Sequence, residues 1–389
     1  MQGLFNLAFA VVVTGLFMGS AWAQGADPRI LLIFDTSGSM GVDIETNLEV
    51  GGDNSREYPG NGGTSRLWIA KQSVSTLVET TSEAQFGLMR YPQLEGDGIN
   101  RGAADGFNQN YYEGLADTPL NYRGTCTGTL RAADPETGYS LIVPFQEDNE
   151  GDVISWLNNF EEWPMDRELR ATGPAPLVES LRLAESYFSE IMPIDPGVRC
   201  RTHSIVLLTD GSESCVNRDT EAALNAQIER LRSIRVRLGR EEVIKDVRVF
   251  VLGFAVNQQA EAQLTAIARA GGTAVNRFGS VDPITGDAYY ADDPNGLRDA
   301  FSRILRNAIP TESCNGEDDD CDDAIDNNPI NIQTFYYDSD GDQDGDPNTG
   351  IESCAVLEGY VSLQGDCDDT NENISSIEPE LCSDDVDEN

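Results

Sequence analysis

Basic residues and histidine are scarce in this sequence. Lys and Arg together number 26 against 67 Asp and Glu, so the formal net charge is −41 at pH 7. A protein that binds nucleic acid by neutralising phosphates needs a basic surface, so this class is excluded. His203 is the only histidine, and the sequence shows no nucleophile–base signature and no Gly-rich phosphate loop followed by Lys. We therefore expect a binding protein and not an enzyme.

Long hydrophobic runs are confined to the amino-terminal segment. Residues 4–18 are mostly apolar and precede Ala-Trp-Ala at 21–23, which has the small-x-small pattern of a signal-peptide cleavage site. No later segment approaches the ~18 apolar residues that span a bilayer. We expect residues 1–23 to be a signal peptide and the mature protein to be secreted, periplasmic or on the cell surface. An uncleaved membrane anchor is the alternative, because the first residues include no Lys or Arg.

The stretch from Ile30 to Phe34 is continuously apolar, which is typical of a strand buried on both faces. It is followed by Asp35, Ser37 and Ser39, which place a carboxylate and two hydroxyls at the carboxyl end of the strand. Oxygen ligands of this kind suit Mg²⁺ or Mn²⁺. A polar turn is the alternative interpretation of this motif when it is considered alone.

Strands and helices alternate along the first 310 residues. Strands are predicted at 30–34, 85–91, 141–145, 204–208 and 247–254, and helices at 66–81, 152–160, 176–191, 221–234, 261–270 and 295–308. This order predicts an α/β fold with a doubly wound, mostly parallel sheet and helices on both faces. Ligand sites in such sheets lie beyond the carboxyl ends of the strands. Asp210 follows one buried strand as Asp35 follows another, which favours a shared metal site.

These residues resemble a von Willebrand factor type A domain, a Rossmann-like fold, over about residues 28–310. In that family the metal-ion-dependent adhesion site combines Asp-x-Ser-x-Ser with a later Asp, and here Asp35, Ser37, Ser39 and Asp210 match these positions. The resemblance implies that Mg²⁺ or Mn²⁺ binds there, and that a carboxylate of a protein partner completes the coordination shell.

The middle element of the family's site departs from the pattern. The usual Gly-x-Thr-Pro-Leu is Gly-Pro-Ala-Pro-Leu at 173–177, so Ala175 stands where the family has a ligand Thr. Thr172 could supply a hydroxyl only if the loop is rearranged. We therefore expect a degenerate site, with weak or partner-dependent metal binding. The alternative is a vestigial site on a scaffold.

Residues 311–389 form an acidic tail that contains 25 Asp plus Glu and no Lys or Arg. Such a segment can be disordered, but cysteines and repeated motifs favour structure here. The register Asp340, Asp342, Asp344, Gly345 copies the opening of an EF-hand calcium loop. Carboxylates without imidazole or thioether favour Ca²⁺ over copper. The predicted calcium ligands are Asp338, Asp340, Asp342, Asp344, Asp346, Asp366, Asp368 and Asp369.

The tail resembles the Asp- and Cys-rich metal-binding repeats of the MopE type. The chain is therefore divided into a signal peptide (1–23), a type A domain (24–310) and an acidic repeat region (311–389). The repeat spacing implies disulfides Cys314–Cys321 and Cys354–Cys367 within the tail.

Three further cysteines lie before the tail. Cys200 precedes a predicted strand and Cys215 follows it, so at ~3.3 Å per residue they are too far apart to pair. Cys215 is expected at the same end of the sheet as Cys126, and we predict a Cys126–Cys215 disulfide. Cys200 is predicted to pair with Cys382. Eight cysteines in an exported chain are expected to be mostly in disulfides.

The leading hypothesis is an exported adhesion-type protein. Its degenerate metal site, together with the long loops at 41–65 and 92–139, would engage a protein ligand that offers a carboxylate. The alternative is a calcium-binding surface protein in which the type A domain is only a scaffold.

Overall fold

The computed structural model describes most of the chain between Asp27 and Asn371. The predicted signal peptide, Thr172, and most of the two long loops lie outside the described residues. The described ranges are 27–48, 64–94, 123–132, 137–158, 169–171, 173–216, 218–320, 324–366 and 368–371.

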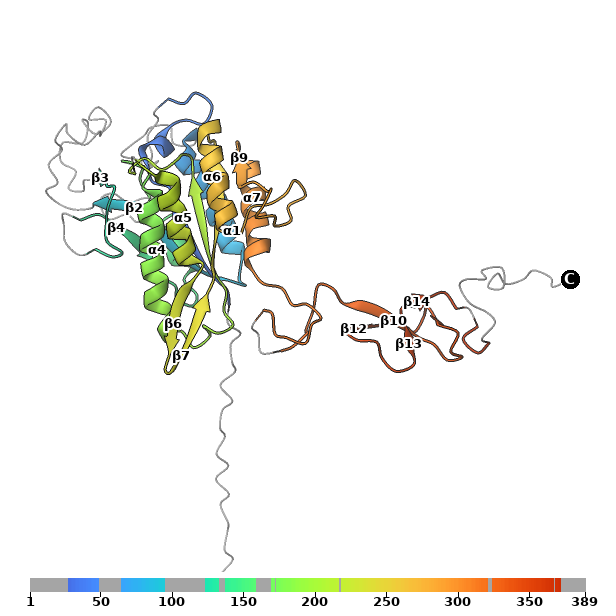
Figure 1. Ribbon diagram of the computed structural model, residues 1–389. Coiled ribbons are helices and arrows are strands. Elements are labelled where there is room, and N and C mark those ends of the chain that lie inside the picture. Colours follow the sequence, from blue (N-terminus) through green and yellow to red (C-terminus); the bar gives the residue numbers. More distant parts are fainter. Residues whose placement is uncertain are drawn as a thin grey trace, which may run out of the picture.

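A seven-stranded sheet forms the centre of the larger unit (Figure 1). The strand order is β3-β2-β1-β5-β8-β9, with β4 paired to β2. β1 pairs in parallel with β2 and β5, and β8 pairs in parallel with β5 and β9, whereas β3 and β4 are antiparallel to β2. The strands are β1 (Arg29–Phe34), β2 (Gln85–Leu94), β3 (Arg123–Gly124), β4 (Tyr139–Val143), β5 (His203–Thr209), β8 (Val247–Phe254) and β9 (Tyr289–Ala291).

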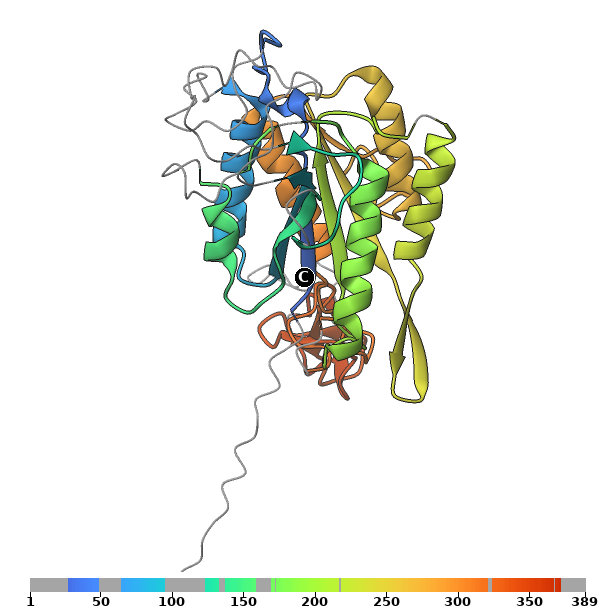
Figure 2. The same cartoon turned by 90° about the vertical axis from the view of Figure 1, so that its left-hand side faces the viewer.

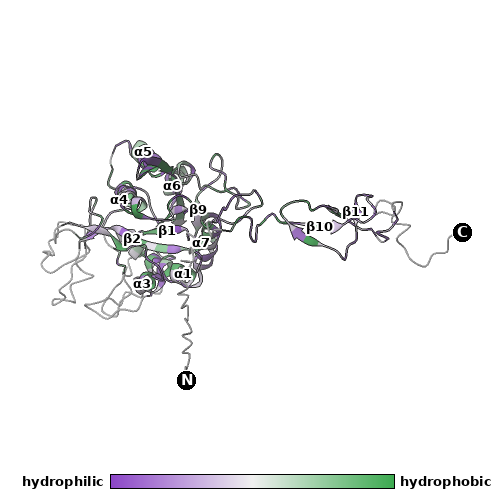
Figure 3. Ribbon diagram, turned by 90° about the horizontal axis from the view of Figure 1, so that it is seen from below, coloured by the Kyte–Doolittle hydropathy of each residue, from purple (hydrophilic) through white to green (hydrophobic). Residues whose placement is uncertain are grey.

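Helices cover both faces of this sheet, which confirms the predicted fold class. Figure 3 shows α1, α3 and α7 on one face and α4, α5 and α6 on the other. In Figure 2, α1 (blue) and α4 (green) lie on opposite sides of the strands. The helices are α1 (Arg66–Thr80), α3 (Glu150–Ser155), α4 (Leu177–Ile191), α5 (Thr220–Leu231), α6 (Gln258–Ala270) and α7 (Pro294–Ala308).

β1 lies between two separate hydrophobic cores because its side chains alternate between the faces of the sheet. Ile30, Leu32 and Phe34 belong to the core under α1 and α7. Leu31 and Ile33 belong to the core under α4, α5 and α6. All five are at most 2% exposed. Burial on both faces explains the continuous apolar run and fixes the position at which the polar residues begin.

The predicted helix at 221–234 is too long. α5 ends at Leu231, and residues Ile234–Leu238 form β6, which pairs with β7 (Glu241–Lys245) in a hairpin. Along β6, buried Ile234 and Val236 alternate with exposed arginines, which is the period-two pattern of a half-buried strand. The hairpin, drawn in yellow, extends beyond the helices in Figure 1.

The tail forms three short strand pairings with little hydrophobic core. β10 (Gln333–Tyr337) pairs with β12 (Ile351–Ser353) and β13 (Tyr360–Val361), while β11 (Asp344–Gly345) pairs with β14 (Leu363–Gln364). Among the described residues of the tail, Phe335 is the buried hydrophobic side chain, at 3% exposure. A unit with so small a core needs disulfides or bound metal for stability.

The predicted Cys126–Cys215 disulfide is confirmed, with Cα atoms 5.4 Å apart. The predicted pairs Cys314–Cys321 and Cys354–Cys367 are wrong, because Cys314 is bonded to Cys354. Cys200 is also disulfide-bonded, and its predicted partner Cys382 lies outside the described residues.

The tail's strand pairing explains the Cys314–Cys354 disulfide. Ser353 pairs with Gln333 at the start of β10, so Cys354 lies beside the residues that precede β10. One of these, Asn331, accepts a hydrogen bond from the Cys314 backbone N–H at 2.7 Å. The two cysteines therefore meet although 40 positions separate them.

Candidate metal-binding site

The carboxyl ends of β1 and β5 lie side by side. Phe34 pairs with Leu208 in the parallel register, and the Asp35 backbone N–H donates to the Leu208 carbonyl at 2.9 Å. The residues that follow both strands therefore converge at one end of the sheet, as expected for this fold class. We call the group Asp35, Ser37, Ser39 and Asp210 the sheet-edge site.

Asp35 holds the two loops of the sheet-edge site together. One carboxylate oxygen accepts a hydrogen bond from the Ser37 backbone N–H at 2.7 Å, and the other accepts from the Thr209 hydroxyl at 2.6 Å. Asp35 is fully buried. Burial, followed by the negative charge of Asp210, raises the pKa of Asp35 to about 7. Asp35 is thus placed to orient the site, with both of its oxygens already hydrogen-bonded.

Three oxygen atoms converge beside Asp35. The hydroxyls of Ser37 and Ser39 are 2.9 Å apart, and the Ser39 hydroxyl donates to Asp210 Oδ1 at 2.7 Å. Ser37 is buried and Ser39 is exposed, so the site opens to solvent at Ser39. The structure brings together all four residues that the sequence placed in the Mg²⁺ or Mn²⁺ site.

Arg66 also belongs to this site, although no motif in the sequence points to it. Arg66 is the first residue of α1, and its Nη1 lies 2.6 Å from Asp210 Oδ2. Its Nη2 donates to the side-chain oxygen of Asn47 at 2.7 Å. Arg66 and Asp210 are 144 positions apart, so only the packing of α1 against the sheet reveals their contact.

The loop that carries the substituted position lies against the Asp-x-Ser-x-Ser turn. The Gly38 N–H donates to the Gly173 carbonyl at 2.9 Å. Ala175 is held by Ser214, whose hydroxyl accepts from the Ala175 N–H at 2.8 Å and whose own N–H donates to the Ala175 carbonyl at 3.0 Å. Ala175 offers a methyl group where the family's site has a hydroxyl, and Thr172 lies outside the described residues.

The oxygen atoms of this site are therefore of the type that a hard divalent cation binds, but there are fewer of them than such a cation needs. Two hydroxyls and Asp210 provide oxygen ligands, and Asp35 is positioned to bind through water. One oxygen of Asp210, however, is already paired with Arg66. The residues fit Mg²⁺ or Mn²⁺ if the Arg66 guanidinium moves away from that oxygen.

The tail contains a second kind of candidate site, built from carboxylates. Asp340, Asp366 and Asp369 can each direct one oxygen to a common point, and so can Asp338, Asp340 and Asp342. The first group joins the loop after β10 to the segment after β14. A further group is Glu312, Asp318 and Asp320.

Asp366 is the strongest single indication of a ligand in the tail. It is 2% exposed, and its Oδ2 atom is buried without a hydrogen-bond partner. The Oδ2 atoms of Asp340 and Asp342 are also buried and unpartnered. Burial, and then the charges of Asp342, Asp340 and Asp369, raise the pKa of Asp366. A cation would neutralise this charge and occupy the free lone pairs.

The EF-hand register predicts only part of this arrangement. Asp346 and Asp368 accept local hydrogen bonds from Asn348 and Thr370, and Asp344 lies in β11; none of the three belongs to the candidate groups. The cluster is completed by Asp366 and Asp369 from a distant segment, after β14. Calcium binding by these residues stays a prediction.

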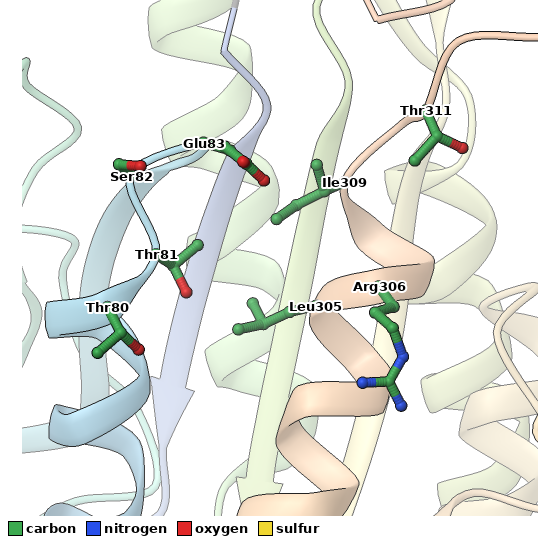
Figure 4. Close-up of a pocket in the computed structure, with 8 residues that line it drawn as sticks. All are labelled: Thr80, Thr81, Ser82, Glu83, Leu305, Arg306, Ile309 and Thr311. Atoms are coloured by element: carbon green, nitrogen blue, oxygen red, sulfur yellow. The ribbon is translucent and has the colours of Figure 1, made fainter. Parts of the chain in front are cut away.

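A pocket of about 400 Å³ lies at the opposite end of the sheet, where α1 and α7 end. Figure 4 shows Leu305 and Ile309 facing Thr81 and Glu83 across it. β1 begins beside this end, since Arg29 pairs with Gln85, so the pocket is separate from the sheet-edge site.

Comparison with known proteins gives only distant likenesses. No family model matches the chain, and no curated protein matches it. Solved structures align with about 72% of it, among them an aerotolerance-related membrane protein from Bacteroides fragilis (15% identity, 99% of that chain, TM-score 0.37). The SpRpn10 VWA domain aligns over 71% of this chain and 94% of its own at 11% identity, with a TM-score of 0.36. The PilB minor pilin from Streptococcus sanguinis aligns over 73% of this chain and 62% of its own, at 14% identity and a TM-score of 0.41.

These values are too low to bear on function. The fold class rests on the sheet and its two helical layers. Within the described residues, no helix is long and apolar enough to cross a membrane.

Proposed function

We propose that this chain is an exported, adhesion-type binding protein whose sheet-edge site engages a carboxylate of a protein partner through a cation. The observation that carries the proposal is the run of hydrogen bonds from the Ser37 hydroxyl to the Ser39 hydroxyl and on to Asp210, at a solvent-accessible point. A cation held there would keep a coordination position directed to solvent. A partner's carboxylate suits that position because it is a hard, charged oxygen ligand.

The second long loop supports this role by its attachment. The Cys126–Cys215 disulfide fastens the described part of that loop to the segment after β5, five residues beyond Asp210. Gly128 N–H also donates to Glu179 of α4 at 3.0 Å. Part of the loop is therefore fixed near the sheet-edge site, where it would contact a partner docked on the cation. The disulfides also support export, since they persist in oxidising compartments.

A binding role is favoured over catalysis by the position of His203. This side chain is buried at the start of β5, beside Arg29, and thus at the opposite end of the sheet from Asp35. A general base at the sheet-edge site would have to come from another residue type.

The test uses the full chain and an immobilised library of peptides that each carry one Asp or Glu among neutral residues. We expect retention of a subset in Mn²⁺, loss of retention in EDTA, and at least tenfold weaker binding by Ser39→Ala. Ser75→Ala removes an exposed hydroxyl from α1 and is the matched control, expected to bind as the wild type does. Retention that EDTA leaves unchanged would contradict the proposal.

A second candidate function is calcium binding by the tail, with the type A domain as a scaffold. The observation that favours it is the buried, unpartnered Oδ2 of Asp366 beside Asp340 and Asp369. In a Ca²⁺ titration by calorimetry, Asp366→Asn should lose at least one tight equivalent. Glu358→Gln is the matched control, because Glu358 is an exposed acidic residue of the tail that lies outside the candidate groups and the predicted ligands. Equal losses in the two variants would contradict this assignment.

A further inference from the structure

We propose that Arg66 is the resident cation of the sheet-edge site, and that a divalent cation binds there only by displacing its guanidinium from Asp210. This inference rests on the proposed function and concerns its regulation. The Arg66 Nη1–Asp210 Oδ2 distance is 2.6 Å, and the side chains are 13% and 0% exposed. A pair this close and this buried is part of the structure of the site, unlike a solvent-exposed ion pair.

A positive charge stabilises the form of the site in which Asp35 and Asp210 are both ionised. Asp35 and Asp210 both lie within it, and the Asp210 backbone N–H approaches Asp35 Oδ2 at 3.3 Å. Two buried carboxylates so near each other repel unless a cation lies beside them. Arg66 supplies that charge from the first turn of α1.

Each Asp210 oxygen has one partner in this arrangement. Oδ1 accepts the Ser39 hydroxyl, and Oδ2 accepts Arg66. A metal that takes Asp210 together with Ser37 and Ser39 must compete with the guanidinium for charge and for space. Because Ala175 provides no hydroxyl, the incoming metal also lacks one of the family's ligands. Both effects lower the affinity for the metal.

Displacement of Arg66 would break its hydrogen bond to Asn47, which lies in the described part of the first long loop. Arg66 Nη2 donates to Asn47, and the turn that contains Asn47 is closed by the Asn47 N–H to Asp43 carbonyl bond at 3.0 Å. Asp43 in turn bridges to Ser65, next to Arg66. Arg66 thus links the turn at 43–47 to Asp210, and release of the guanidinium breaks its hydrogen bond to this turn as the cation enters. Metal binding and the contact of Arg66 with Asn47 are coupled through this one side chain.

The test is a calorimetric Mn²⁺ titration of the full chain in excess Ca²⁺, which saturates carboxylate sites in the tail. Arg66→Gln should lower the Kd for Mn²⁺ at least tenfold. Arg29→Gln is the matched control: Arg29 pairs with the buried Asp195 at 2.8 Å, with side chains 16% and 0% exposed, at the opposite end of β1. It should leave the Kd unchanged. Adding Asp210→Asn should abolish the tight equivalent in the Arg66→Gln background.

Asn47→Gly provides a milder variant if Arg66→Gln fails to fold. It removes the anchor of the guanidinium at a position with φ of 53°, which glycine adopts without strain. We expect it to lower the Kd for Mn²⁺ by two- to fivefold.

The outcomes separate the two proposals. Equal Mn²⁺ affinity in the wild type, Arg66→Gln and Asn47→Gly would overturn the role of Arg66 and leave the cation-dependent function standing. Absence of Asp210-dependent binding in all of these proteins would overturn both. Binding by Arg66→Gln alone would support the displacement and show that the arginine closes the wild-type site.

Discussion

The hydroxyl of Ser39 donates a hydrogen bond to Asp210 at 2.7 Å, across 171 positions of sequence. This contact exists because β1 and β5 are parallel neighbours whose carboxyl ends coincide. It joins the exposed turn after β1 to the buried carboxylate after β5. The candidate metal chemistry of the larger unit depends on this relationship.

The position of Ala175 predicts that one substitution can raise the metal affinity of the site. Ala175→Thr would restore a hydroxyl on the loop that is hydrogen-bonded to Gly38, so Mg²⁺ affinity should rise about tenfold, which corresponds to ~1.4 kcal/mol. Calorimetry in excess Ca²⁺ measures the change. Ala222→Ser, on the exposed side of α5, adds a hydroxyl away from the site and should have no effect. An unchanged affinity in Ala175→Thr would show that this loop does not provide a ligand.

Loss of the Cys126–Cys215 disulfide should destabilise the larger unit. The two cysteines are 89 positions apart, and closing a loop of this length lowers the entropy of the unfolded chain enough to stabilise the fold by about 4.6 kcal/mol. We expect the Cys126→Ser/Cys215→Ser double variant to melt roughly 10 °C lower than the wild type in a calorimetric scan. A melting temperature within 2 °C of the wild type would show that the loop is held by its other contacts.

Stability should fall as the pH drops below the pKa of unfolded histidine. Burial, and next the charge of Arg29, lower the pKa of His203 to about 3. Below pH 6.5 the unfolded chain therefore binds a proton at His203 that the folded chain does not bind. The contribution of His203 to stability is complete above pH 6.5 and is lost as the pH falls. At pH 5 the loss should be about 2 kcal/mol.

Urea unfolding at pH 7 and pH 5 tests this linkage. His203→Gln cannot take up the proton, so its loss of stability between the two pH values should be smaller by about 2 kcal/mol than that of the wild type. Equal losses in the two proteins would assign the acid sensitivity to other groups.

Removal of calcium should loosen the tail and leave the larger unit intact. Without a cation, the carboxylates of Asp338, Asp340 and Asp342 repel one another beside β10. Tyr337 and Tyr360 pair across β10 and β13 with ring centroids 5.3 Å apart, so the near-ultraviolet circular dichroism of tyrosine reports the change. We expect EGTA to alter this signal and to speed proteolysis after residue 310. If EGTA changes neither the circular dichroism signal nor the cleavage pattern, the tail is stable without metal.

The fold class was predictable because its main signals are local. The apolar runs of β1, β5 and β8 identify strands buried on both faces, and the polar residues that follow them mark the edge at which the site forms. The strand β6 was missed because its first buried residue, Ile234, lies three positions after Leu231 and so continues the spacing of the buried residues of α5. A five-residue alternation next to a helix is too short to separate the two periods.

The site was predictable only where its residues follow strands. Asp35, Ser37, Ser39 and Asp210 are placed by β1 and β5, whereas the contact of Arg66 depends on how α1 packs against the sheet. The Cys314–Cys354 disulfide likewise depends on the pairing of β10 with β12, which spacing along the chain does not encode. Contacts of this kind follow from tertiary structure alone.

The most direct test of the account is a Mn²⁺ titration of the full chain in saturating Ca²⁺, beside the Asp210→Asn variant. Asp210 is the carboxylate that Ser39 and Arg66 share, so its loss removes the one charged ligand at the opening of the sheet-edge site. We expect one saturable, Asp210-dependent equivalent of Mn²⁺ in the wild type. Identical isotherms for the two proteins would contradict it and leave metal binding to the acidic tail.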